Sequence, residues 1–391
     1  MADLIIPFSR ELSDLKQQHL LRHLRTVGSG NGPWITVDGR SVLLLCSNDY
    51  LGLAGHQDLQ DAARAAMDRY GFGAGASRLV SGSSPLHEEL EQTLARFKGT
   101  EAALLFNSGY AANTGIIPAL ASEGDAILSD GLNHASIIDG CRLSRAEVHV
   151  YSHGDMNHVE SLLKKTARAR RRLIVTDGVF SMEGDIAPLP DLCTLAEKYG
   201  ALLMVDDAHA TGVLGDSGRG TAEHFGVSGR VPVQMGTLGK ALGSFGAYIA
   251  GDRDMITYIL NKARSLIFST ALPPAVCAAS LAALRVLEQE PWRREQLRKN
   301  VHRFVVVLMA QGVDVAASET PIIPIIIGDS EKALLAGQSL MDKGMFALAV
   351  RPPTVPEGTA RIRMTIMATH SPEDLDRAAA AVGMLKQEGL L

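Results

Sequence analysis

Apolar and polar residues follow one another along this chain in a pattern that predicts strands separated by helices. Between residue 58 and about residue 285, short apolar runs typical of buried strands recur at 103–109, 125–130, 147–152, 172–178, 201–209 and 231–239. Helical periodicity lies between them, for example at 84–99 and at 191–200, where a glycine favours the end of the second helix. Nearly continuous apolar strands that alternate with helices predict an α/β fold, with a mostly parallel sheet covered on both faces.

The pattern changes toward both ends of the chain. We expect an amphipathic helix at 11–25, a long charged helix at 291–312, and a last helix that begins with Ser371 as N-cap and Pro372 in its first turn. A chain of 391 residues is longer than one hydrophobic core usually serves. We therefore predict an N-terminal helical arm over 1–45, a large domain over 46–287 and a smaller α+β domain over 288–391.

Composition narrows the classes of partner. Hydrophobic residues make up 46% of the chain and the formal net charge is -5, which gives no electrostatic reason to expect nucleic acid or a membrane surface. The basic run at 164–172 is interpreted as a solvated helix end, with nucleic-acid binding as the alternative. No apolar run reaches the roughly 18 residues that a membrane span needs.

Cysteine and histidine spacing argues against structural metal. The four cysteines, Cys46, Cys141, Cys193 and Cys277, are far apart and form no CxxC pair, so a reduced compartment fits better than a disulfide framework or a zinc site. His149, His153 and His158 straddle a predicted strand and turn, which is a poor arrangement for metal ligands. The first residues lack a basic leader, and we expect a cytoplasmic protein without a metal.

Polar residues gather where the predicted strands end. In parallel sheets, ligands bind beyond the carboxyl ends of the strands, and several side chains that converge there indicate an active site. The residues at these positions are Ser108, Gly109, Asn133, His134, Asp177, Ser181, Asp206, Asp207, His209, Thr237 and Lys240.

Lys240 is flanked by Gly236, Gly239, Gly243 and Gly246, just after an apolar strand. Glycines at this density suggest that the backbone closely approaches a bound group. A partly desolvated amine at such a place can be a nucleophile that forms a Schiff base with a carbonyl. The alternative is a solvated loop lysine.

Two further groups complete a candidate cofactor site. Asp206, followed by His209, stands at a strand end, where a carboxylate can pair with a protonated pyridine nitrogen; the alternative is that Asp206 and Asp207 cap the next turn or form an ion pair. Ser108, Gly109 and Tyr110 begin a predicted helix whose amide N–H groups can hold a phosphate, to which Thr237 can add a hydroxyl. The alternative for these is an ordinary helix N-cap.

The order and spacing of the lysine, the acid, the histidine and the phosphate site resemble those of fold-type I pyridoxal-phosphate enzymes. Among these enzymes, the chain resembles the α-oxoamine synthase family. Ordered blocks along nearly the whole chain carry the resemblance: SNDYLGL (47–53), GFGAGASRLVSG (71–82), LNHASIIDG (132–140), TDGVFSMEGD (176–185), VDDAHATGVLG (205–215), GTLGKALG (236–243), IFSTALPP (267–274) and RPPTVPEGTARIRMT (351–365). Glu183 departs from the commoner Asp. The resemblance implies a large domain with a mostly parallel, seven-stranded type of sheet.

The resemblance also implies a role for each matching residue. Lys240 would hold pyridoxal 5'-phosphate covalently and then transfer protons, and Asp206 would keep the pyridine nitrogen protonated. His209 and Ser181 would contact the side of the cofactor that carries its phenolic oxygen, and His134 would stack on the ring. The remaining residues would bind the phosphate or the substrate: Ser108, Gly109, Tyr110 and Thr237 the phosphate region, Ser269 and Thr270 the phosphate of a neighbouring subunit, Asn48 the substrate pocket, and Arg363 the amino-acid carboxylate, with Arg351 as a weaker partner and Arg361 as a rival.

Within the family, SRLVSG and RPPTVPEGTARIR are most similar to the branch that condenses L-alanine with a pimeloyl thioester, carried by coenzyme A or by a carrier protein. The implied partners are these small molecules and a second copy of the chain in a homodimer with shared active sites. A glycine-using relative is the nearest rival. A dinucleotide-binding oxidoreductase is a remote one, because GFGAG (71–75) follows a helical segment where the dinucleotide motif needs a strand. A non-catalytic partner subunit would be expected to lack Lys240.

Overall fold

The computed structural model describes residues 8–28, 30–315 and 318–391. They form two compact units: residues 48–297, and the described part of residues 1–47 together with residues 298–391. The border falls inside helix α12 (Trp292–Ala310). The N-terminal segment groups with the C-terminal unit because β2 (Arg40–Leu44) pairs in parallel with β11 (Met345–Phe346).

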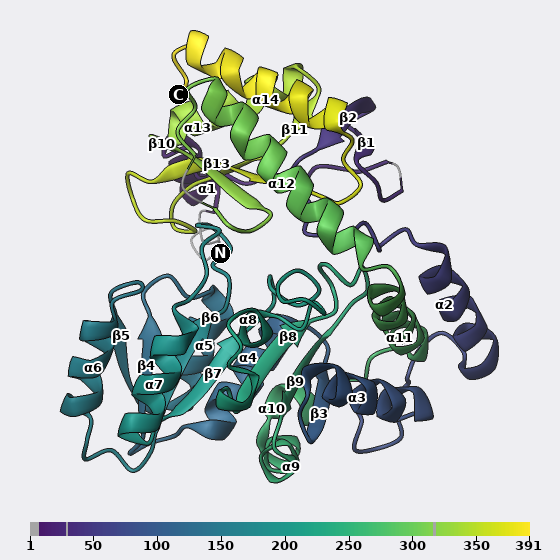
Figure 1. Ribbon diagram of the computed structural model, residues 1–391, viewed down its shortest axis with the longest axis vertical. Helices are drawn as coiled ribbons and strands as arrows, with labels where there is room; N and C mark the ends of the chain where they lie inside the picture. The colour runs from purple at the N-terminus through teal and green to yellow at the C-terminus, as the bar shows by residue number, and fades with distance from the viewer. Residues whose placement is uncertain (1–7, 29, 316–317) are drawn as a thin grey trace, which may run out of the picture. The chain divides into compact units, whose positions relative to one another are not determined.

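A seven-stranded sheet forms the centre of the unit 48–297 (Figure 1). Its strand order is β3-β9-β8-β7-β6-β4-β5, and β9 alone is antiparallel to both of its neighbours. The strands are β3 (Ala102–Phe106), β4 (Ala126–Asp130), β5 (Glu147–Tyr151), β6 (Arg172–Asp177), β7 (Leu202–Asp206), β8 (Val233–Thr237) and β9 (Ala247–Gly251). The predicted α/β fold and all six predicted strands are confirmed, whereas β9 was not predicted.

Helices cover both faces of this sheet, because successive strand residues point to opposite sides. Ile127 packs in a core with α4, α5, α9 and α10, whereas Leu128 packs in a second core with α6 and α7. The helices of this unit are α2 (Gln57–Tyr70), α3 (Pro85–Lys98), α4 (Gly109–Leu120), α5 (Ala135–Ser144), α6 (Met156–Lys165), α7 (Leu189–Tyr199), α8 (Thr221–His224), α9 (Arg253–Lys262), α10 (Arg264–Ile267) and α11 (Pro274–Gln289), with a 3-10 turn at Ser228–Arg230.

The second unit contains two small sheets. Strands β10 (Ile322–Gly328), β13 (Ala360–Thr365) and β12 (Leu348–Val350) are antiparallel, and β1 (Trp34–Val37) pairs with β2. Its other helices are α1 (Phe8–Gln17), α13 (Ser330–Asp342) and α14 (Pro372–Gln387). Ser371 is the N-cap of α14, as predicted, and forms a capping box with Asp374.

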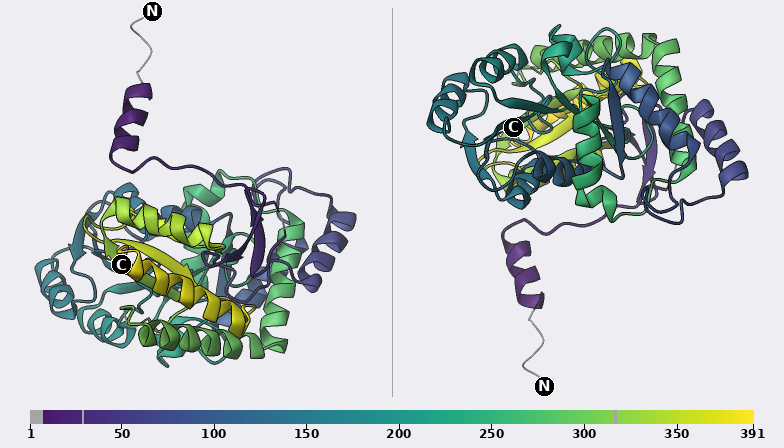
Figure 2. Two further views of the ribbon diagram at one scale, coloured as in Figure 1. Left: turned by 90° about the horizontal axis from the view of Figure 1, so that it is seen from above. Right: turned by 90° about the horizontal axis from the view of Figure 1, so that it is seen from below.

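The N-terminal helix is shorter than the pattern predicts. Helix α1 ends at Gln17, and His19 has a φ of 57°, so the prediction of helix over 18–25 is wrong. A left-handed residue cannot continue a right-handed helix, and the N–H of Leu20 turns back to the carbonyl of Leu15. No residue of α1 is buried, and Figure 2 shows α1 reaching away from the other elements of its own unit.

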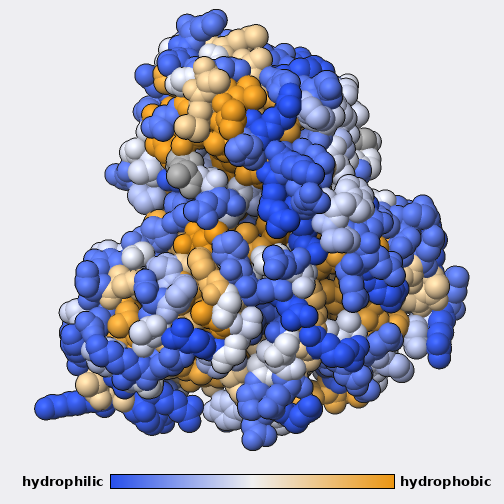
Figure 3. Space-filling model, in the orientation of Figure 1, coloured by the Kyte–Doolittle hydropathy of each residue, from blue (hydrophilic) through white to orange (hydrophobic). Residues whose placement is uncertain are grey.

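Hydrophilic residues dominate the face drawn in Figure 3. Among the described residues, no helix is both long enough and apolar enough to cross a membrane.

Candidate functional site

The predicted site residues of the large unit lie along one edge of its sheet. Strands β3, β4, β6, β7 and β8 all run in the same direction, since β9 is antiparallel to both β3 and β8. Their carboxyl ends therefore meet at one edge, and the loops that follow them carry the residues chosen from the sequence. These are Ser108 after β3, His134 after β4, Ser181 after β6, His209 after β7 and Lys240 after β8.

Lys240 contacts a histidine from the neighbouring loop. Its Nζ atom lies 2.8 Å from Nε2 of His209, whose Nδ1 lies 2.7 Å from the hydroxyl of Tyr50. Tyr50 is fully buried and also donates to Oδ1 of Asn48 at 3.3 Å. The sequence singled out Lys240, His209 and Asn48, whereas Tyr50, which joins them, was missed although it stands in the SNDYLGL block.

The acid at the end of β7 is buried and well supported. Oδ1 of Asp206 accepts the N–H of Ala208 at 2.9 Å, and Oδ2 accepts Nδ2 of Asn113 at 2.7 Å. Asn113 also donates to Ser136, while its Oδ1 is buried with no hydrogen-bond partner in the described part of the chain. Sequence analysis missed Asn113; the available signal was an amide inside an otherwise apolar helix, four residues after Gly109.

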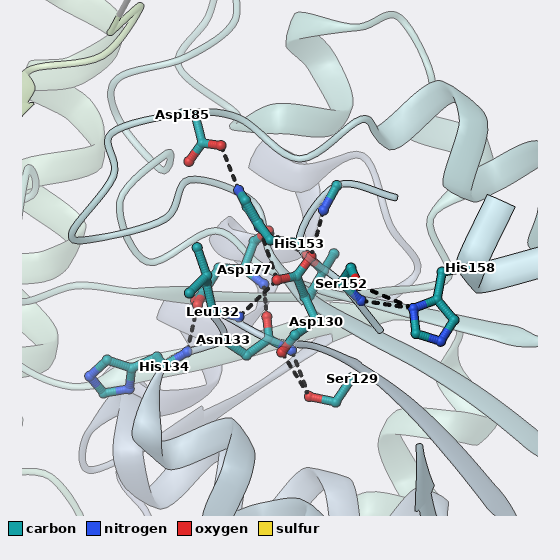
Figure 4. Close-up of polar contacts among 12 residues, drawn as sticks. Ser129, Asp130, Leu132, Asn133, His134, Ser152, His153, His158, Asp177 and Asp185 are labelled. Carbon is teal, nitrogen blue, oxygen red and sulfur yellow. Dashed lines mark hydrogen bonds and ion pairs between the residues drawn. The ribbon is translucent and has the colours of Figure 1, made fainter. Parts of the chain in front are cut away.

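His134 caps helix α5 and is held by the adjacent strand (Figure 4). Its backbone N–H donates to Oδ2 of Asp177 at 2.7 Å, and its Nδ1 lies 2.8 Å from the hydroxyl of Ser136. Asn133 accepts the N–H of Asp177 at 2.8 Å, which closes the contact between the two strand ends.

Burial shifts the pKa values of His134 and Asp177. Burial lowers the pKa of His134, an effect that Asp206 opposes and Lys240 reinforces. Burial also raises the pKa of Asp177 well above its usual range, and the nearby charge of Asp206 adds to the rise. His134 is therefore a neutral ring at neutral pH, which suits stacking on a planar group better than an imidazolium that needs solvent.

The predicted phosphate site has the backbone that such a site needs. Ser108 is the N-cap of α4, its hydroxyl accepts the N–H of Ala111 at 3.1 Å, and Gly109 begins the helix. The hydroxyl of Tyr110 donates to Asp139 on α5. The hydroxyl of Thr237 donates to the carbonyl of Gly246 at 2.9 Å and accepts the N–H of Gly239 at 3.2 Å. Phosphate binding by these residues stays a prediction.

Ser181, Ser269 and Thr270 lie in loops of the same unit. Ser181 stands in the turn that follows β6. Ser269 and Thr270 follow α10, and Thr270 pairs with Ser77 and accepts Nδ2 of Asn107 at 2.7 Å through its carbonyl. The contribution of Ser269 and Thr270 to a neighbouring subunit stays a prediction.

The arginine candidates belong to the other unit. Arg361 and Arg363 are buried on β13, two residues apart and therefore on the same face of their sheet. Arg351 donates to the carbonyl of His19, its Nε atom is buried without a partner in the described chain, and burial together with Arg22 lowers its pKa.

Two of the glycines around Lys240 allow other parts of the protein to pack directly against the backbone. A Cβ on Gly243 would lie 2.3 Å from the backbone N of Ala54, and Gly243 has a φ of 61°. A Cβ on Gly236 would lie 2.5 Å from the hydroxyl of Tyr248. The close approach that the sequence predicted is thus, at these two positions, an approach to the protein itself.

Next to Asp206, a buried ion pair fixes the turn that leads to His209. Nζ of Lys98 lies 3.0 Å from Oδ2 of Asp207, and the other carboxylate oxygen, Oδ1, accepts the hydroxyl of Thr221 at 2.6 Å. Burial by itself would lower the pKa of Lys98, but Tyr248 and Asp207 beside it raise it. The alternative interpretation of an ion pair therefore holds for Asp207, whereas Asp206 keeps its carboxylate toward Asn113.

These residues fit pyridoxal 5'-phosphate. An amine, a buried carboxylate, a neutral imidazole and a helix N-terminus all stand at one sheet edge. Asp206 is 3% exposed. Beside it, Oδ1 of Asn113 is buried and has no hydrogen-bond partner in the described part of the chain, which indicates a site for a polar ligand atom. Lys240 can hold the aldehyde, Asp206 the pyridine nitrogen, and the start of α4 the phosphate.

Comparisons with known proteins agree with this chemistry. The aminotransferase class I and II family matches residues 40–382. The chain is 55% identical over 380 residues to 8-amino-7-oxononanoate synthase of Geobacter sulfurreducens, covering 97% of each protein. A solved structure of a serine palmitoyltransferase variant from S. paucimobilis with a bound PLP–myriocin aldimine is similar with a TM-score of 0.94 and 30% identity, covering 99% of this chain and 98% of that one. A crystal structure of 8-amino-7-oxononanoate synthase from Francisella tularensis is similar with a TM-score of 0.77 and 28% identity, over 90% of this chain and 99% of that one.

Proposed function

Because the chain belongs to the aminotransferase class I and II family, and within it to the 8-amino-7-oxononanoate synthases, we propose that it condenses L-alanine with a pimeloyl thioester. The products are 8-amino-7-oxononanoate, CO2 and the free thiol, and the pathway is biotin biosynthesis. The observation that carries the proposal is the contact of Lys240 with His209 beside a buried Asp206, in a chain 55% identical to such a synthase. The enzyme is an acyltransferase that depends on pyridoxal 5'-phosphate.

Bound pyridoxal 5'-phosphate supplies an electron sink for the bonds at Cα of the amino acid. Asp206 would stabilise a proton on the pyridine nitrogen, and Asn113 and the N–H of Ala208 fix the orientation of its carboxylate. His134, neutral and anchored to Asp177 through its backbone, would stack on the ring of the bound cofactor.

Lys240 moves the proton. Its Nζ atom takes the Cα proton of alanine, and His209, tied to Tyr50, orients the amine for that transfer. A C–C bond then forms between Cα and the thioester carbonyl carbon as the C–S bond breaks, and the departing thiolate takes a proton from solvent to become the free thiol. The carboxylate is lost as CO2, and Lys240 returns a proton to Cα.

Arg363 binds the alanine carboxylate in this proposal. A guanidinium presents paired donors that match both carboxylate oxygens. A carboxylate that departs as CO2 must be held in a defined direction, which a buried and oriented fork achieves better than a solvated lysine.

Product analysis tests the proposed function. The purified enzyme is incubated with L-alanine and pimeloyl-CoA, and the amino ketone is identified by mass spectrometry, with release of free thiol measured in parallel. Glycine with acetyl-CoA, assayed in the same way, tests the nearest rival. If enzyme loaded with pyridoxal 5'-phosphate makes product only from glycine, the chain has the activity of a glycine-using member of the family instead.

We also propose that the enzyme is a cytoplasmic homodimer. Large apolar side chains are exposed in the loop 72–80 and near residue 268, with Phe72 and Val80 both 79% exposed and Phe268 71% exposed. The two segments are adjacent, since the N–H of Ala271 donates to the carbonyl of Ala76. Exposed apolar residues that cluster in this way favour burial by a protein partner, and a second copy would place Ser269 and Thr270 next to it.

The dimer is tested by sedimentation and light scattering of Phe268→Glu. We expect this variant to become monomeric and to lose pyridoxal 5'-phosphate. Val150→Glu, at an exposed position on the edge strand β5, is the matched control and should stay dimeric. A dimer of unchanged stability in Phe268→Glu would refute this interface.

A further inference from the structure

His153 makes contacts that the proposed chemistry does not use. Its Nδ1 lies 2.9 Å from Oδ1 of Asp130, and its Nε2 lies 2.7 Å from Oδ2 of Asp185 (Figure 4). The ring also meets the ring of Phe180 edge to face, with 4.4 Å between the centroids. One imidazole thus joins three segments: the end of β4, the loop after β5 and the turn after β6.

The contact with Asp130 reaches the segment that carries His134. Oδ1 of Asp130 also accepts the N–H of Leu132 at 2.9 Å, and its Oδ2 accepts the N–H of Gly154 at 3.2 Å. The backbone carbonyl of Asp130 accepts the N–H of Asn133. The two residues before His134 are therefore both bonded to Asp130, Leu132 through the carboxylate and Asn133 through the backbone carbonyl, and the carboxylate is in turn bonded to His153.

The contact with Asp185 closes the turn that carries Ser181. The N–H of Phe180 donates to the carbonyl of Asp185 at 3.0 Å, and Val179 pairs with Ile186 just outside the turn. Phe180 also packs on the His153 ring. Both ends of the turn around Ser181 are thus attached to the same imidazole.

Charge explains why a histidine is suited to this place. Burial would lower the pKa of His153, but its hydrogen bonds to Asp130 and Asp185 raise it to about 10. Both ring nitrogens therefore donate, each to a carboxylate, and such charge-assisted bonds are stronger than neutral ones. The side chain of Asp130 is 3% exposed, so His153 supplies it with a hydrogen-bond donor at a place that solvent hardly reaches.

We propose that His153, bridging Asp130 and Asp185, is a positioning residue that holds His134 and Ser181 in place for the cofactor. The inference rests on the proposed function, because it concerns residues that would contact pyridoxal 5'-phosphate. His153 itself touches neither substrate nor cofactor in this proposal. Its effect passes through the two loops that it joins.

The test replaces His153 by Phe, which keeps a ring against Phe180 and removes both ion pairs. Apoenzyme is titrated with pyridoxal 5'-phosphate, and the dissociation constant is read from absorbance, together with the circular dichroism of the bound cofactor. We expect the dissociation constant to rise roughly 10-fold or more and the circular dichroism band to weaken, because small misplacement of positioning groups is costly.

Two companion variants separate positioning from a general loss of structure. Asp185→Asn weakens only one of the two contacts, at a partly exposed position, and should raise the dissociation constant by a smaller factor. If His153→Phe does not fold, Asp185→Asn serves as the test of the positioning role. His158→Phe is the matched control, since His158 lies in the first turn of α6, five residues after His153, and its hydrogen bonds go to Ser152 and Asp155; this variant should bind the cofactor as the wild type does.

The outcomes distinguish the two proposals. Wild-type protein that takes up pyridoxal 5'-phosphate, together with His153→Phe and Asp185→Asn variants of unchanged affinity and circular dichroism, overturns the role of His153 alone. Variants that lose only the thermal stability of the apoenzyme, with cofactor affinity intact, overturn it as well. Wild-type protein that binds no pyridoxal 5'-phosphate overturns the proposed function itself.

Discussion

The amine of Lys240 and the imidazole of His209 stand 2.8 Å apart, although 30 residues and a whole strand separate them in the chain. The contact forms because β7 and β8 are parallel neighbours, so that the loops after them emerge side by side. His209 is held in turn by Tyr50, which lies far away in the sequence. The amine therefore belongs to an oriented network of buried groups.

Replacement of Lys240 by Ala should abolish turnover. Without the amine, no group at this edge can hold the cofactor covalently or take the Cα proton, and we expect kcat to fall at least roughly 1000-fold. The measurement is thiol release with L-alanine and pimeloyl-CoA, together with the visible absorbance band of the bound cofactor. Lys262→Ala, on the surface helix α9, is the control and should keep both. Normal turnover by Lys240→Ala would remove the basis of the mechanism.

Replacement of Tyr50 by Phe should affect both stability and rate. It leaves Nδ1 of His209 without its buried hydroxyl partner, which costs about 1–3 kcal/mol in free energy of unfolding. We also expect a lower kcat, because His209 then orients Lys240 less firmly. Tyr248→Phe is a matched comparison: it removes another buried hydroxyl, which contacts Thr211 instead of His209. Urea denaturation should show a lower free energy of unfolding in both variants. We expect kcat to fall further in Tyr50→Phe than in Tyr248→Phe.

The sequence was sufficient to place Lys240, Asp206 and His134 at one edge of the sheet. Lys240, Asp206 and His134 each follow an apolar run, and parallel strands bring such positions together without further information. Strand β9 was missed because its five apolar residues follow directly on the glycine-rich Lys240 segment and show no polar alternation. Periodicity identifies amphipathic elements best, and a short strand buried on both faces offers little of it.

The sequence pattern did not predict contacts between distant segments. The bond between Tyr50 and His209, and the attachment of Asn113 to Asp206, depend on how α4 and the loop after β2 pack. The end of α1 at Gln17 depends on the left-handed backbone of His19, a residue type that gives no strong stop signal. Side-chain networks and single backbone conformations are fixed by tertiary structure, which periodicity does not encode.

The cysteines should resist thiol reagents in the native protein. Burial raises the pKa of Cys46 and Cys277 to about 12 and that of Cys141 to about 11, and it also raises the pKa of Cys193. A thiol with a raised pKa holds little of the reactive thiolate at neutral pH. We expect slow labelling by a disulfide reagent in the native state and labelling of all four thiols after denaturation. Rapid labelling of native protein would contradict this.

Replacement of Arg363 by Lys should raise the KM for L-alanine. Lysine cannot present the paired donors of a guanidinium, and loss of a buried charged contact costs about 2 kcal/mol or more, which is roughly 30-fold in kcat/KM. Arg361→Lys is the comparison, because Arg361 is buried on the same face of β13 and donates to the carbonyl of Thr359. Melting temperatures of both variants show whether the fold is kept. A larger effect from Arg361→Lys would assign the carboxylate to that residue.

The ion pairs of His153 should make part of the stability depend on pH. The pKa of His153 rises from 6.5 to about 10 in the folded protein, so the folded state binds the proton more tightly than the unfolded state. Its contribution is therefore complete below pH 6.5 and is lost progressively as the pH rises through about 10. The measurement is the free energy of unfolding of the wild type minus that of His153→Phe, determined by urea denaturation at several pH values across this window. Other titrating groups largely cancel in the difference, which should shrink as the pH rises. A difference that stays constant, or that grows with pH, would mean that the imidazole is not held as a cation between Asp130 and Asp185.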